Sequence, residues 1–130
     1  MILKNTENKK KIQLTISSDG MENICCQASV FEKSGSLYIM YEHYGEPCSV
    51  KIKGKHVTIL RHKSATRMEI EEGTTHMSRY ITPLGTLSFE ITARRVDNRL
   101  DTDGTLTLEY LISAGGEADE NKVIIKTEEI

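Results

Sequence analysis

The stretch Met68-Glu-Ile-Glu-Glu-Gly-Thr-Thr-His-Met-Ser-Arg-Tyr-Ile-Thr-Pro-Leu-Gly85 decides the fold of this chain. It lies on two segments, 66–72 and 75–82, which alternate apolar and polar side chains on either side of Gly73. Alternation with a period of two is the pattern of a strand with one buried face. Pro83–Gly85 then supplies a tight return, because glycine accepts the left-handed backbone of a short hairpin loop. The stretch therefore predicts two antiparallel strands.

The same alternation extends outward in both directions. Glycines punctuate the chain, mostly nine to twenty residues apart, and no helical stripe of useful length competes between them. About ten short strands with no covering helix must close into a barrel or pack as a sandwich. We prefer a single antiparallel β-barrel of about 8–10 strands with mostly meander connections. The expected strands are 11–18, 22–33, 36–44, a short one through Val50 and Ile52, 56–62, 66–72, 75–82, 86–100 with a bulge after Arg94-Arg95, 105–113 and 121–126.

Composition indicates one domain. The 130 residues suffice for a core without disulfide or metal staples, and we expect a flexible tail over 1–10 and the barrel over 11–130. The 17 basic and 19 acidic residues give a formal charge of −2, which offers no field to collect nucleic acid or an anionic membrane. The longest apolar runs are too short to cross a bilayer. We therefore expect neither nucleic acid nor membrane as a partner.

The cysteines, histidines, serines and glycines of the chain are not spaced as in known catalytic or metal-binding motifs. Three cysteines leave one unpaired in any disulfide scheme, so reduced thiols are expected. The N-terminal lysines precede no apolar signal-peptide core, which favours a cytoplasmic protein. Four histidines lack ligand spacing, and there is neither a Gly-x-Ser-x-Gly elbow nor a phosphate-cradling glycine loop. We expect no metal, no cofactor and no catalytic residue, and an enzyme ranks third among the hypotheses.

Arg61 is the first candidate binding residue. It shares phase with Val57 and Ile59, so its guanidinium is aimed into the barrel, where an unpaired charge is costly. Glu72, in phase with Met68, offers a structural ion pair, and a position at the barrel mouth would also relieve the charge. The sharper alternative is a ligand carboxylate or phosphate, which matches the guanidinium fork.

Arg79 depends on the register of the hairpin around Gly85, since a slip of one residue exchanges the two faces of a strand. A three-residue loop directs Met77, Arg79 and Ile81 inward and allows Arg79 to stack on Phe89. A two-residue loop at Pro83-Leu84 directs His76, Ser78 and Tyr80 inward instead. We prefer the three-residue loop because it matches apolar with apolar side chains.

Three motifs then resemble a known family. They are Met68-x-Ile70-x-x-Gly73, Tyr80-x-Thr82-Pro83-x-Gly85 and Gly104-x-Leu106-x-Leu108-x-Tyr110, followed by Asn121 at the start of the last strand. In order and spacing they resemble the YwiB-like family of small uncharacterised bacterial proteins. The resemblance implies a lipocalin-like (calycin-type) antiparallel barrel in a bacterial cytosol and carries no established function.

Two functional hypotheses remain open. In the first, the barrel binds a small amphipathic or anionic molecule in its interior or mouth, with two arginines as anchors and three aromatic side chains as walls. The hypothetical ligand-binding residues are Arg61, Arg79, Tyr80, Phe89 and Tyr110. In the second, the barrel is filled by its own side chains and an outer face serves a homodimer or another protein partner. A void beside the arginines would distinguish the two.

Overall fold

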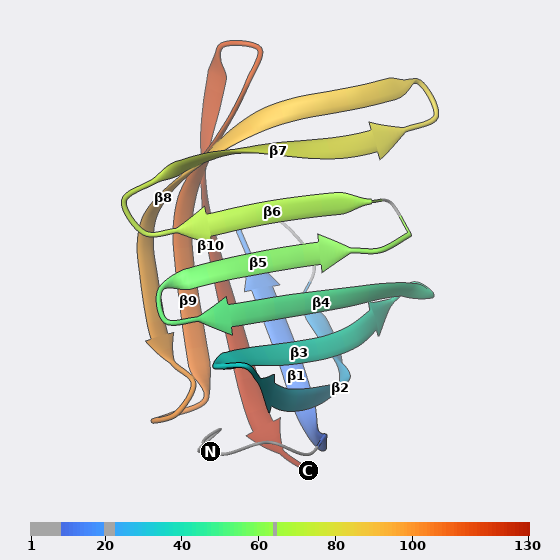
Figure 1. Cartoon of the computed structure of the whole chain (residues 1–130), viewed down its shortest axis with the longest axis vertical. Helices are drawn as coiled ribbons and strands as arrows, with labels where there is room; N and C mark the ends of the chain where they lie inside the picture. Colours follow the sequence, from blue (N-terminus) through green and yellow to red (C-terminus); the bar gives the residue numbers. More distant parts are fainter. Residues whose placement is uncertain (1–8, 20–22, 64) are drawn as a thin grey trace.

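The chain forms a closed barrel of ten antiparallel strands in the computed structural model, which describes residues 9–19, 23–63 and 65–130 (Figure 1). Each strand pairs with the next along the chain, and the first strand pairs with the last to close the ring. No helix among the described residues is long and apolar enough to cross a membrane. The strands are β1 (Lys10–Ser18), β2 (Ile24–Lys33), β3 (Ser36–His43), β4 (Glu46–Lys53), β5 (His56–Arg61), β6 (Thr66–Glu71), β7 (Thr75–Thr82), β8 (Gly85–Arg99), β9 (Thr105–Ala114) and β10 (Glu117–Glu129). The predicted antiparallel barrel with meander connections is confirmed.

Fully buried inward-facing side chains are concentrated toward one end of this barrel, which we call the closed half. A surface hollow of about 630 Å³, lined by residues such as Leu37, Val96 and Leu100, lies at its outer end. On β1, Ile12 and Leu14 are fully buried while the intervening Gln13 is not, as alternation requires. Each such aliphatic side chain contributes about 1.5–3 kcal/mol by leaving water. The fully buried large side chains of the closed half are Ile12, Leu14, Val30, Ile39, Val57, Ile70, Val96, Leu106 and Leu108.

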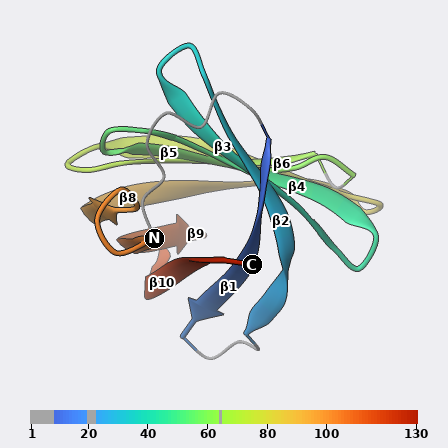
Figure 2. The ribbon, with the colours of Figure 1, turned by 90° about the horizontal axis from the view of Figure 1, so that it is seen from below.

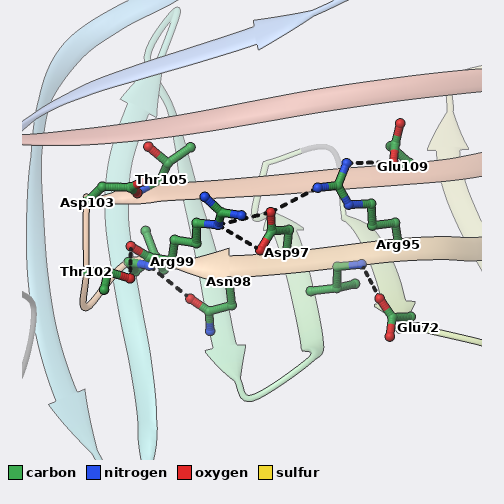
Figure 3. Close-up of polar contacts among 11 residues, drawn as sticks. Glu72, Arg95, Asp97, Asn98, Arg99, Thr102, Asp103, Thr105 and Glu109 are labelled. Carbon is green, nitrogen blue, oxygen red and sulfur yellow. Dashed lines mark hydrogen bonds and ion pairs between the residues drawn. The ribbon is translucent and has the colours of Figure 1, made fainter.

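The long strand β8 bends at a bulge between Ala93 and Arg95, as the switch of apolar phase predicted. Beyond the bulge, the backbone N–H of Val96 donates to the Glu72 carboxylate at 2.9 Å (Figure 3). Arg95 bridges Asp97 and Glu109 at 3.0 and 3.3 Å. These exposed ion pairs contribute little stability individually. The pair with Asp97 lies within β8, whereas the pair with Glu109 connects β8 beyond the bulge to β9.

Two predicted hairpin registers are wrong by two residues and still keep the correct faces. Matching the apolar faces of neighbouring strands predicts Tyr41 near Val50 and Arg61 beside Met68. In the structure Tyr41 lies opposite Cys48, and Arg61 lies opposite Thr66. Because side chains alternate with a period of two, a shift of two leaves every residue on its original face. The inward positions of the predicted strands therefore stand.

The predicted register of the β7–β8 hairpin is wrong by one residue. Thr82 pairs with Gly85, so the loop is the two-residue Pro83-Leu84 alternative, and Ser78 rather than Arg79 is buried opposite Phe89. Met77, Ile81 and Leu87 are all more than half exposed. Apolar matching could not set the register, because the outer part of this hairpin does not rest on the core.

Between the expected strands 105–113 and 121–126 the sequence predicts a polar loop over 114–120, and this prediction is also wrong. A turn at Gly115-Gly116, both with positive φ, lets β10 begin at Glu117 and pair with the end of β9. This part of the ladder is polar because it extends past the core. Some predictions fall on residues outside the described part of the chain. The sequence predicts a turn at Asp19-Gly20 and a loop through Lys63-Ser64-Ala65, and each includes such residues, as does the start of the expected strand 22–33. Most of the predicted tail also lies outside it, while Lys10 is the first residue of β1.

Candidate functional site

The end of the barrel opposite the closed half is hollow, and we call it the open half. It holds a cavity of about 590 Å³, within the range of small-molecule sites. Aliphatic and thioether side chains at inward positions form its walls: Ile16, Ile24, Val50, Ile59, Met68, Ile112, Val123 and Ile125. Polar side chains form its rim and upper wall: Ser18, Asn23, Tyr41, His43, Tyr44, Arg61, Tyr110 and Asn121.

Along the strands that enter this cavity, the inward-facing side chains change from fully buried aliphatic residues to polar ones. Inward positions of β5 read Val57, Ile59, Arg61, from fully buried aliphatic to half-buried cation. On β9, fully buried Leu108 is followed inward by Tyr110. The site is therefore an apolar pocket with its polar groups concentrated toward one end, which suits an amphipathic occupant.

Arg61 lies at the mouth of the cavity and also lines a smaller hollow with His43, Tyr44, Glu46 and Lys63. No carboxylate of the described residues is within ion-pair distance of its guanidinium. Glu72 binds elsewhere, to Lys55 Nζ at 2.9 Å and to the backbone N–H of Val96. The predicted Arg61–Glu72 pair is wrong, and the mouth position that was its alternative is observed.

Two tyrosines share this end of the cavity with Arg61. Burial raises the pKa of Tyr41 to about 12, helped by the Cys48 thiol and opposed by the nearby Arg61 guanidinium. Burial also raises the pKa of Tyr110, again against the influence of Arg61. Both phenols therefore stay protonated at neutral pH and can donate hydrogen bonds. A guanidinium beside two phenol donors is suited to a carboxylate, sulfonate or phosphate oxygen.

The thiols near the cavity are not activated. Burial raises the pKa of Cys48 despite the neighbouring Arg61, and burial together with Cys25 raises the pKa of Cys26. A thiol needs a lowered pKa to act as a nucleophile at neutral pH. Across the described ranges, no group of three or more His, Cys, Asp or Glu side chains is arranged to hold a metal ion.

Two of the five predicted binding residues come together here, Arg61 and Tyr110. Arg79 lies exposed on the outer face, and Phe89 packs half-buried against the core without lining the cavity. The side chain of Tyr80 lies outside the described part of the chain. The sequence prediction missed Tyr41, although its phase with Leu37 and Ile39 already marked it as inward-facing.

Comparisons with known proteins agree with the barrel. The family model described as "Domain of unknown function (DUF1934)" matches residues 7–125. The crystal structure of the ywiB protein from Bacillus subtilis superposes with a TM-score of 0.76 at 16% sequence identity, covering 94% of this chain and 93% of that one. No curated protein matches. At that identity the structural likeness shows a shared fold.

Proposed function

The chain belongs to the DUF1934 family, a domain of unknown function, and we propose that its barrel binds a small amphipathic anion in the open half. The observation that carries this proposal is Arg61, a half-buried guanidinium at the polar end of a cavity whose remaining walls are aliphatic and thioether side chains. The acidic head of the ligand contacts Arg61, and its apolar body lies against Ile59 and Met68.

The physical argument is one of charge compensation. A cation drawn partly out of water loses hydration, and a protein normally restores the balance with a carboxylate. Arg61 has no such ion-pair partner among the described residues, while Tyr41 and Tyr110 add hydrogen-bond donors beside it. An anionic head group supplies the missing charge and accepts from all three side chains. Its apolar body gains affinity by leaving water within the cavity.

Two fluorescent probes that differ only in charge test this proposal. Anilinonaphthalene sulfonate carries a sulfonate that phenylnaphthylamine lacks. Arg61→Met should weaken binding of the sulfonate by about 10- to 100-fold, the equivalent of one to two charge-assisted hydrogen bonds, and leave binding of the neutral probe nearly unchanged. Fluorescence titration gives both dissociation constants. Arg61→Lys should fall between, because it keeps the charge and loses the fork.

Arg79→Met is the matched control, since it removes the same guanidinium from the exposed outer face. It should leave both dissociation constants as they are. The proposal fails if Arg61→Met weakens the two probes equally, because the effect would then come from a damaged cavity. It also fails if the sulfonate binds the unaltered protein no better than the neutral probe does.

A second candidate function, self-association, is favoured by the outer part of the β7–β8 hairpin. Met77, Ile81, Leu84 and Leu87 are all more than half exposed there. Met77 and Ile81 share the outer face of this hairpin, whereas Leu87, opposite Tyr80, lies on the other face and Leu84 lies in the loop. Exposed apolar side chains gathered at one end of a sheet are typical of a protein interface. If this hairpin forms a homodimer, sedimentation velocity should show a dimer at micromolar concentration that Ile81→Glu converts to monomer. A protein that is monomeric throughout that range, before and after the substitution, would exclude a homodimer of this kind.

A further inference from the structure

The wall of the barrel parts between β2 and β3 beside the open half. Their ladder runs only from Lys33 opposite Ser36 to Ser29 opposite Met40. Beyond it, the start of β2 continues to pair with β1, and the end of β3 continues to pair with β4. The two strands thus diverge toward the open end, as Figure 2 shows where β2 and the β3–β4 hairpin run apart.

A cleft of about 530 Å³ occupies this divergence. Successive residues of a strand point to opposite faces, so a groove on the outer surface would be lined by outward-facing residues alone. This cleft instead has both kinds, with Cys26, Ala28 and Cys48 in inward phase and Gln27, Met40 and Glu42 in outward phase. It therefore passes into the wall of the barrel.

Tyr41 connects the cleft with the cavity. Its side chain is buried and lines both of them, with the cleft on one side and the interior space beside Arg61 on the other. Tyr41 also lies just past the last paired residue of β3 on the β2 side, Met40. On that side no ladder partner in β2 fixes its backbone, so its ring can change rotamer at less cost than a ring inside a complete ladder.

We propose that this cleft is a lateral entrance to the cavity, with Tyr41 as its gate. The inference rests on the proposed function and narrows the ligand to an anion with a slender, unbranched apolar chain. Ala28, Met40 and Pro47 give the passage apolar walls, while Lys11 and Glu42 line its outer part. A chain slides between the diverging strands past the displaced ring, and its head group ends beside Arg61.

Gln27→Trp tests the entrance from outside the cavity. Gln27 is exposed, in outward phase and on the cleft, so an indole there obstructs the passage without touching the binding groups. With cis-parinaric acid, an unbranched fluorescent carboxylate, as the probe, stopped-flow fluorescence should show association and dissociation rate constants that both fall by about tenfold. The dissociation constant should stay the same, because the substitution changes the path and leaves the two end states alone.

Gln13→Trp is the matched control. Gln13 lies directly opposite Gln27 on β1 and does not line the cleft, so both rate constants should be unaffected. Unchanged rates in Gln27→Trp, with binding intact, would overturn the entrance and leave the binding cavity standing. If the unaltered protein binds neither this probe nor the naphthalene sulfonate, the proposed function is overturned, and the entrance with it.

Discussion

Gly104→Ala should lower the free energy of unfolding by about 3 kcal/mol, through two costs that act together. Gly104 has φ of +77°, a left-handed conformation that disfavours any Cβ atom by about 1–2 kcal/mol. An added Cβ would also lie 2.6 Å from the carbonyl oxygen of Thr127. That oxygen belongs to the β10 backbone and cannot move aside as a flexible side chain would.

The contact between Gly104 and Thr127 explains why the clash cannot relax cheaply. The backbone N–H and the hydroxyl of Thr127 both donate to the Gly104 carbonyl, at 2.8 and 2.9 Å. Thr127 is buried, so moving it away would leave these polar groups without partners. The β8–β9 turn and β10 are therefore held at a separation that only glycine permits.

Gly35→Ala separates the two costs. Gly35 has nearly the same φ, +79°, but a Cβ there would meet nothing within 4 Å. It should cost only about 1 kcal/mol. Urea unfolding followed by circular dichroism measures both variants, and unchanged m-values confirm that midpoints can be compared. Equal losses at the two glycines would show that the close approach to Thr127 carries no energy.

The sequence was sufficient to predict the barrel because the same alternation of apolar and polar residues recurs in many separate strands. Alternation on β1, β5 and β9 identifies inward faces independently, and a two-residue register error leaves those faces intact. The β7–β8 hairpin failed for a different reason. Its outer apolar residues, such as Met77 and Ile81, are exposed, so matching them to a core gave false information.

For the candidate site, the sequence predicted which side chains face inward but could not predict which of them meet in one site. Phase alone placed Arg61 and Tyr110 inside, and it placed Tyr41 there as well. That these three meet depends on how the ends of β3, β5 and β9 are carried around the ring, which no local pattern encodes. The cavity likewise depends on summed side-chain volumes, and the parting of β2 from β3 depends on pairing that the alternation does not specify.

The second large expected effect is a difference in the free energy of unfolding between the same substitution made in the closed half and in the open half. Ile70→Ala should lower the free energy of unfolding by about 3–4 kcal/mol, because Ile70 is fully buried on β6 among close-packed neighbours. Truncating its side chain loses the free energy gained when the removed atoms leave water, and it leaves a void that the neighbouring side chains cannot fill. Ile59→Ala removes the same atoms from the adjacent strand β5, at a position that already lines the cavity.

Ile59→Ala should therefore cost only about 1–2 kcal/mol, since fewer packing contacts are lost and an existing space is merely enlarged. Thermal and urea unfolding of both variants measure the difference, with Leu87→Ala, whose side chain is more than half exposed, as a near-neutral reference. The ratio of the two losses in free energy of unfolding matters more than either value, because both substitutions remove the same atoms of an isoleucine. If Ile59→Ala cost as much as Ile70→Ala, the open half would be packed as tightly as the closed one, and a ligand would have no room beside Arg61.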